Sequence, residues 1–183
     1  MSGIAMFLAD GFEEIEGLTT VDMCRRAGIN VTTVSIMDSI DIMGSHNIPV
    51  RADMLFDDVK YEQYDMFVLP GGGTGTENLE KCEKMKNVLK KADAAGKYIA
   101  AICAAPRILG DLGMLNGKRV CCYPGNEDHM KLATIVSRKE KAVTDGKYIT
   151  ARGMGASAEF AYEIITALKG RETADDIMRK IQF

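Results

Sequence analysis

Cys103 is the residue of this sequence best suited to nucleophilic chemistry. It stands between a predicted strand, Tyr98–Ile102, and a predicted helix, Ala104–Leu112, with alanines on both sides. A sharp turn from strand to helix crowds its neighbours, so small residues are needed around such a nucleophile. The positive end of the following helix favours thiolate over thiol and predicts a lowered thiol pKa. The alternative, a small buried hydrophobe, is the usual role of a free cysteine and stays open.

A glycine-rich loop could supply hydrogen-bond donors to this cysteine. In Pro70–Gly73 the missing side chains let the N–H groups of Gly71 and Gly72 approach a ligand. Together with the N–H of Ala104, such donors could stabilise an oxyanion. The loop matches neither the GxxxxGK[ST] nor the GxGxxG pattern, which removes the main support for nucleotide binding. Glycine-rich turns after strands are common, so a purely structural loop is the alternative.

Three glutamates open the first predicted helix, Glu13–Ala27. Glu13 and Glu14 are expected to be structural, because the helix dipole favours acidic residues in the first turn. Glu16 lies one turn in, between an apolar residue and a glycine. A carboxyl group in an apolar cleft has a raised pKa and stays protonated, so Glu16 could hydrogen-bond to a thiolate and act as acid or base. A structural role for Glu16 is the alternative.

The elements that must position these residues alternate between short apolar runs and amphipathic stretches. Strands are expected at 4–9, 31–36, 66–69, 98–102 and 118–122, with a small β excursion at 40–43 and 48–51 and a hairpin of 142–144 with 148–151 around Asp145-Gly146. Helices are expected at 13–27, from 77 or 83 to 95, at 104–112, 156–168 and 173–181. This alternation predicts one α/β domain over residues 1–183, a mainly parallel sheet with helices on both faces. Ligands then bind beyond the carboxyl ends of the strands.

Composition excludes several classes of protein. The 183 residues are 46% apolar and 27% charged with a net charge of −3, so nucleic acid is not expected as a partner. No apolar run approaches the roughly 18 residues of a membrane span, and no membrane partner is expected. Five cysteines without a CxxC pair indicate neither a disulfide framework nor a structural metal site, and favour a reducing, cytoplasmic location.

Together these segments resemble the ThiJ/PfpI family of the class I glutamine amidotransferase-like superfamily, and specifically its Parkinsonism-associated deglycase branch. The likeness covers nearly the whole chain. The matching stretches are 8–16 (LADGFEEIE), 25–28 (RRAG), 69–72 (LPGG), 100–106 (AAICAAP) and 152–155 (RGMG).

The resemblance implies a flavodoxin-like three-layer sandwich with a nucleophile elbow, and a homodimer with pockets near the subunit interface. Cys103 would be the reactive, oxidation-prone cysteine and Glu16 the protonated carboxyl that touches its sulfur. The resemblance implies no cofactor and no metal. The positions expected to bind substrate or its oxyanion are Gly71, Gly72, Ala104, Tyr123, His46 and Arg26.

The sequence departs from the family pattern at positions that matter for proton transfer. Family peptidases place a histidine directly after the nucleophile, where this chain has Ala104. Tyr123 holds a place where the deglycase branch often has a histidine, and a phenol with a pKa of about 10 is a poor base at neutral pH. His46 replaces a common arginine. Glu16 is then the only obvious proton-transfer group.

From these residues we expect a cofactor-independent enzyme of the glyoxalase III or deglycase type. Cys103 would attack the aldehyde of a small dicarbonyl or a glycated substrate, and Glu16 would transfer protons. A redox-sensing or chaperone-like protein with little turnover is the alternative, because an accessible low-pKa cysteine oxidises to sulfenic and sulfinic acid. A cysteine peptidase or amidase is a third reading, which Ala104 disfavours.

Overall fold

Alternate side chains of each central strand point to opposite faces of one sheet, and both faces are covered. The computed structural model describes residues 3–183. In the central strand, Ile4, Met6 and Leu8 pack into one apolar core, and Ala5 and Phe7 pack into the other. Such a strand must be apolar at every position, which is why it reads as an unbroken apolar run.

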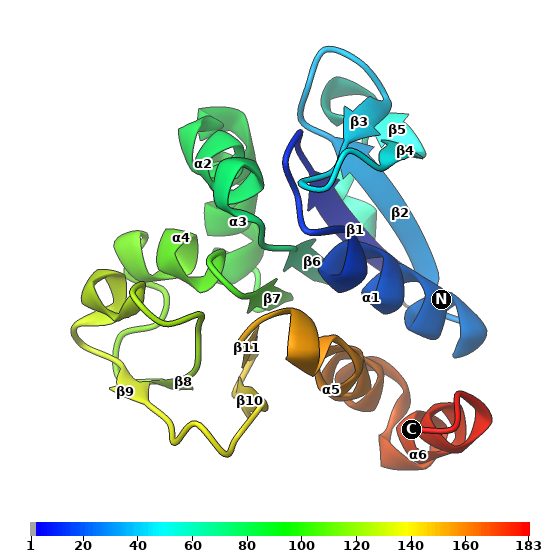
Figure 1. The fold of residues 1–183 in the computed structure, drawn as a ribbon. Coiled ribbons are helices and arrows are strands. Elements are labelled where there is room, and N and C mark those ends of the chain that lie inside the picture. Colours follow the sequence, from blue (N-terminus) through cyan, green and yellow to red (C-terminus); the bar gives the residue numbers. More distant parts are fainter. Residues whose placement is uncertain (1–2) are drawn as a thin grey trace.

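The sheet has seven strands in the order β10-β11-β7-β6-β1-β2-β5 (Figure 1). Every neighbouring pair is parallel except the hairpin of β10 with β11. The predicted mainly parallel sheet and the hairpin around Asp145-Gly146 are confirmed. The strands are β1 (Gly3–Leu8), β2 (Asn30–Ser35), β5 (Met54–Leu55), β6 (Met66–Leu69), β7 (Tyr98–Ile102), β10 (Ala142–Asp145) and β11 (Tyr148–Ala151).

Helices cover both faces of the sheet and give the predicted three layers (Figure 1). One face carries α1 (Glu14–Arg26), α5 (Ser157–Lys169) and α6 (Arg171–Lys180), and the other carries α2 (Gly73–Lys81), α3 (Glu83–Ala94) and α4 (Pro106–Asp111). Two short pairs lie outside the main sheet: β3 (Asp41–Met43) with β4 (Pro49–Arg51), and β8 (Arg119–Val120) with β9 (Thr134–Ile135). Within residues 3–183, no helix is long and apolar enough to cross a bilayer.

Three predicted elements differ in extent from the observed ones. The helix expected from 77 or 83 is two helices, because Cys82 between α2 and α3 has an extended ψ of 91°. The strand expected at 118–122 shortens to β8, since the N–H of Cys121 donates to the Thr150 hydroxyl (3.0 Å) instead of to a neighbouring strand. The helix expected from Ala104 begins at Pro106.

The strand order explains why distant segments meet. β11, β7, β6 and β1 are consecutive in the sheet and run parallel, so their carboxyl ends lie along one edge. The order reverses between β1 and β6, the type of switch point at which α/β sheets bind ligands. The loops after β6, β7 and β11 carry Gly71, Cys103 and Gly153, and the first turn of α1, which follows β1, carries Glu16.

Candidate active site

Cys103 occupies a strained turn between β7 and α4. Its φ of 66° lies in the left-handed region, which costs a non-glycine residue about 1–3 kcal/mol. Hydrogen bonds hold the turn on both sides: the Cys103 N–H donates to the Ala151 carbonyl (2.9 Å), and the Tyr123 N–H donates to the Cys103 carbonyl (2.8 Å). The backbone is therefore locked in the elbow conformation that the alanine-rich segment predicts.

Glu16 reaches this turn from the first helix and is only 1% exposed. Its Oε2 accepts a hydrogen bond from the Gly71 N–H (2.8 Å), whereas its Oε1 has no well-aligned partner in the described part of the chain. Oε1 and the Cys103 sulfur are neighbours, since a Cβ built on Gly153 would lie within 3.8 Å of both, and each group shifts the pKa of the other. One carboxyl oxygen is thus positioned by the loop after β6, and the other is left beside the sulfur.

Two glycines border the Cys103–Glu16 pair, and at Gly71 the pair leaves no room for a side chain. A Cβ on Gly71 would lie 2.5 Å from the Cβ of Cys103 and 2.6 Å from Oε2 of Glu16. A Cβ on Gly153 would lie 3.7 Å from the Cys103 sulfur and 3.8 Å from Oε1 of Glu16. Gly71 and Gly153 therefore form two walls of the site.

The pKa of Glu16 is shifted in the predicted direction. Burial raises it from its usual value of 4.5 to about 7, and hydrogen bonds from Cys103 and Gly71 only partly oppose this. A group with such a pKa is present in both protonation states near neutral pH, which suits a proton-transfer residue.

The prediction of a lowered Cys103 pKa is wrong for the state in which Glu16 is ionised. Burial raises the thiol pKa to about 12, and the negative charge of Glu16 adds to the shift. The expected helix dipole is weak, because α4 begins only at Pro106 and has six residues. The backbone N–H groups of Gly72 and Ala104 act in the opposite direction and lower the thiol pKa. The pair therefore carries at most one negative charge near neutral pH.

The structure brings Gly71, Gly72, Ala104 and Tyr123 to the Cys103–Glu16 pair, as expected. Tyr123 contributes its backbone N–H and keeps its side chain 54% exposed at the edge of the site. Its ring also borders Gly153, since a Cβ there would lie 3.3 Å from Cδ2 of Tyr123.

Arg26 and His46 are not part of this cluster within the chain. Arg26 lies at the opposite end of α1 from Glu16, about 15 Å along the helix axis, and pairs with Asp22 (2.6 Å). His46 lies in the β3–β4 turn, where its N–H donates to Oε1 of Glu14 (2.7 Å) and its Nδ1 lies 3.0 Å from Oε2 of the same residue. Within this chain each of the two is held by a carboxylate outside the pair, and a role for either in binding substrate stays a prediction.

Two groups of carboxylates and histidine among the described residues lie close enough to hold a metal ion. They are Glu13, Glu14 and His46, and Glu80, Asp111 and His129. In the first group Glu14 already binds His46, and in the second Glu80 pairs with Arg107 (2.9 Å). Neither group includes a residue of the Cys103–Glu16 pair.

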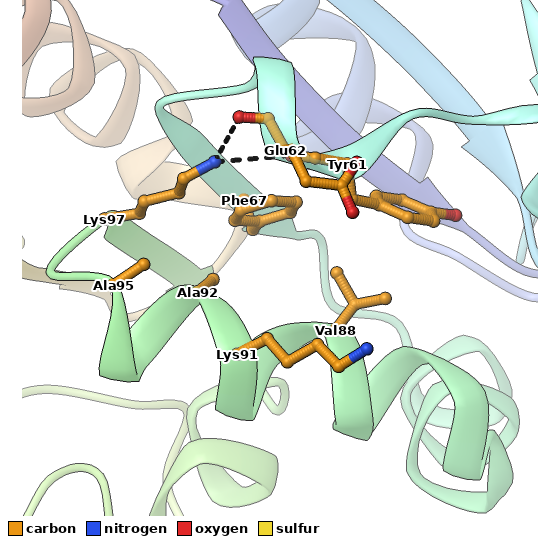
Figure 2. A pocket seen from close by; sticks show the side chains of 8 residues that line it. All are labelled: Tyr61, Glu62, Phe67, Val88, Lys91, Ala92, Ala95 and Lys97. Carbon is orange, nitrogen blue, oxygen red and sulfur yellow. Dashed lines mark hydrogen bonds between the residues drawn. The ribbon is translucent and has the colours of Figure 1, made fainter.

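A cavity of about 310 Å³ lies away from the site, between α3 and the Tyr61–Gln63 turn (Figure 2). Lys97 extends across it over the Phe67 ring, with its ammonium 5.9 Å from the ring centre. That ammonium donates to the carbonyls of Glu62 (2.7 Å) and Tyr61 (3.4 Å). The cavity contains neither Cys103 nor Glu16 and is separate from the candidate site.

A family model agrees with this arrangement. The model of the DJ-1/PfpI family matches residues 2–167. The chain belongs to the DJ-1/PfpI family. Its fold is also that of DJ-1: the solved structure of oxidised DJ-1 from Toxoplasma gondii superimposes with a TM-score of 0.93 at 31% identity, covering 100% of this chain and 99% of that one.

Curated DJ-1/PfpI relatives differ in length from this chain. DJ-1 homolog A of Arabidopsis thaliana is 34% identical over 171 residues, which is 93% of this chain but only 44% of the relative. The chain thus spans less than half of that protein. A protein of Pyrococcus abyssi that is named a deglycase is 31% identical over 166 residues, covering 91% of this chain and 99% of the relative.

Sequence reasoning missed part of this DJ-1/PfpI site. A cavity of about 440 Å³ adjoins the elbow and is lined by Tyr123, Gly153 and three cationic residues, Arg138, Lys141 and Arg152. Arg152 and Gly153 directly follow β11, so the rule that ligands bind beyond the carboxyl ends of parallel strands could have found them. Arg138 and Lys141 come from an irregular segment with no local signal.

Proposed function

We propose that this protein is a cofactor-independent enzyme that converts small dicarbonyls or glycation adducts, with Cys103 as nucleophile and Glu16 as proton-transfer residue. The observation that supports this is a buried carboxyl beside a cysteine in a strained elbow turn, with the backbone N–H groups of Gly72 and Ala104 lowering the thiol pKa. A relative named a deglycase supports the same type of activity.

The proposed first step uses the two pKa shifts together. Near neutral pH the ionised fraction of Glu16 accepts the thiol proton as the Cys103 sulfur adds to the aldehyde carbon. The aldehyde oxygen becomes the oxyanion of a hemithioacetal and accepts hydrogen bonds from the N–H groups of Gly72 and Ala104. The raised thiol pKa is then no obstacle, because the proton leaves during the attack.

The later steps rearrange the substrate without an external oxidant. Glu16 moves a proton from the former aldehyde carbon to the neighbouring carbonyl group, so the first carbon is oxidised to a thioester while the second is reduced to an alcohol. Water then hydrolyses the thioester, restores the Cys103 thiol and releases a hydroxy acid. For methylglyoxal the sum is one water added and lactate released with one proton.

The test is turnover of methylglyoxal to lactate in the absence of glutathione. Wild-type protein should form lactate, and Cys103→Ser should lose at least about a hundredfold in kcat/KM, because a hydroxyl is a far weaker nucleophile at neutral pH. Cys82→Ser is the matched control, since Cys82 is also half-buried and unpaired but lies between α2 and α3. Equal rates in wild type and Cys103→Ser would exclude the proposal.

A redox-responsive role of the same cysteine is the second candidate. The observation that favours it is exposure: Cys103 and Cys82 are half-buried, whereas Cys24, Cys121 and Cys122 are buried. Mild peroxide followed by mass spectrometry should oxidise Cys103 before Cys82, because the N–H groups of Gly72 and Ala104 can bind an oxidised sulfur. Equal oxidation of the two would count against this role.

We further propose a homodimer and a cytoplasmic location. Four large apolar side chains are exposed on neighbouring elements: Ile15 and Leu18 on α1, and Met43 and Ile48 at the β3–β4 pair. Packing a second copy against them would remove this apolar surface from water. The unpaired cysteines fit a reducing compartment. Sedimentation at micromolar concentration distinguishes dimer from monomer.

A further inference from the structure

The cavity of about 440 Å³ beside the elbow is lined by positively charged side chains. Within residues 3–183, its lining includes Arg138, Lys141 and Arg152 but no acidic side chain. Tyr123 and Gly153 form the wall toward Cys103. A Cβ on Gly153 would lie 3.7 Å from the Cys103 sulfur, so a molecule bound in the cavity lies next to the elbow with only this glycine between them.

Nearby carboxylates do not neutralise two of the three cations. Lys141 pairs with Glu159 (2.5 Å). Glu140 is taken by Arg119 (2.8 Å) and offers Arg152 only its backbone carbonyl, which accepts from Nε at 3.0 Å. Arg138 has no carboxylate partner in the described part of the chain. Two guanidinium charges therefore remain available beside the site.

We propose that Arg138 and Arg152 bind an anionic group of the substrate, so that the preferred substrates are α-oxoaldehydes that carry a carboxylate. The reaction in this inference rests on the proposed function, whereas the anion site does not depend on it. Guanidinium groups bind carboxylates through paired N–H donors, and such charged hydrogen bonds are about twice as strong as neutral ones.

A suitable substrate is 4,5-dioxopentanoate, an α-oxoaldehyde with a carboxylate tail. The Cys103 sulfur adds to its aldehyde carbon, Glu16 moves the proton to the neighbouring carbonyl, and water cleaves the resulting thioester. One water is consumed and 2-hydroxyglutarate and one proton are released. The aldehyde carbon is oxidised and the ketone carbon is reduced, so no other reactant is needed.

The first experiment compares 4,5-dioxopentanoate with its methyl ester, which differs only in the charge of the tail. In wild type the ratio of kcat/KM for the acid to that for the ester should be at least about tenfold, as expected for one charge-assisted contact. The ratio should fall toward one in Arg138→Gln/Arg152→Gln. Arg179→Gln on α6, also an exposed arginine, is the control and should keep the wild-type ratio. Turnover of the ester with a wild-type ratio near one would overturn the anion site and leave the proposed function intact.

The second experiment tests the anion site without turnover. Alkylation of Cys103 by anionic iodoacetate is compared with alkylation by neutral iodoacetamide, with Cys82 as the internal reference. The iodoacetate-to-iodoacetamide rate ratio should be at least about tenfold higher at Cys103 than at Cys82, and the double arginine variant should remove this difference. Equal ratios at the two cysteines would overturn the proposal, even if no dicarbonyl is converted and the proposed function fails.

Discussion

Glu14 and Glu16 stand two residues apart on one helix, and both are almost fully buried, at 3% and 1% exposure. Their environments differ completely. Burial alone would raise the pKa of Glu14, but hydrogen bonds from His46 and Ser45 outweigh it and lower the pKa to about 2. Burial raises the pKa of Glu16 to about 7, because only one N–H and a neutral thiol face it.

The contrast separates a carboxylate with several hydrogen-bond donors from a carboxyl group with few. Glu14 fastens the β3–β4 turn to α1 and remains ionised. Glu16 is kept near its point of half-protonation in a pocket with few donors. Burial therefore does not decide what a carboxyl group does; the number of donors that meet it does.

The largest expected effect is on turnover. Glu16→Gln should lower kcat/KM for methylglyoxal by about 10²–10⁴, the usual contribution of a general acid or base, because an amide cannot accept the thiol proton. Glu14→Gln should stay within about tenfold of wild type at a temperature where circular dichroism shows it folded. If the two variants lost activity equally, the contrast between the carboxyls would not be one of chemistry.

The two glutamates should also give opposite pH dependences of stability. Glu14 has a lowered pKa, so its contribution is present above pH 4.5 and is lost as the pH falls toward 2. Glu16 has a raised pKa, so its contribution is present below pH 4.5 and is lost as the pH rises toward 7. Together the two groups favour maximal stability near pH 4.5.

Urea unfolding from pH 2 to 8 measures these two slopes. Each group changes the free energy of unfolding by at most about 1.4 kcal/mol per pH unit within its window. The Glu14 slope should be smaller, because that carboxylate lies beside the exposed His46. In wild type the free energy of unfolding should decrease on both sides of pH 4.5. Glu16→Gln should weaken the decrease above pH 4.5, and Glu14→Gln should weaken the decrease below it. If both variants changed the free energy of unfolding on the same side of pH 4.5, the two glutamates would not have pKa shifts of opposite sign.

The smallest expected effect is at His46. The hydrogen bond and negative charge of Glu14, with the charge of Glu13, raise the imidazole pKa. In Glu14→Gln the midpoint of the His46 titration, followed by NMR, should move down toward its usual value of 6.5. An unchanged His46 midpoint would show that the turn is not held by this ion pair in solution.

Much of the site was predictable because its parts are local. The alanines around Cys103, the glycines after β6 and the position of Glu16 each mark a candidate through spacing, and the family resemblance joined these candidates into one site. Cys103 and Glu16 are 87 positions apart (103 − 16), yet both lie near ends of elements at one edge of a parallel sheet. The mainly parallel sheet and its terminal hairpin were predictable for the same reason, since apolar runs and turn residues are local signals.

The pKa shifts and the charge pairing could not be predicted from the sequence, because each depends on residues from several distant segments. The sequence determined where the strands run and which turn holds Cys103, because side-chain size, apolar periodicity and glycine placement act over a few neighbouring residues. Only the tertiary structure decided that the Cys103 pKa is raised, that His46 and Arg26 are held elsewhere, and that Arg138 and Arg152 border the site. Desolvation and charge pairing depend on every group within a few ångströms, and those groups come from distant parts of the chain.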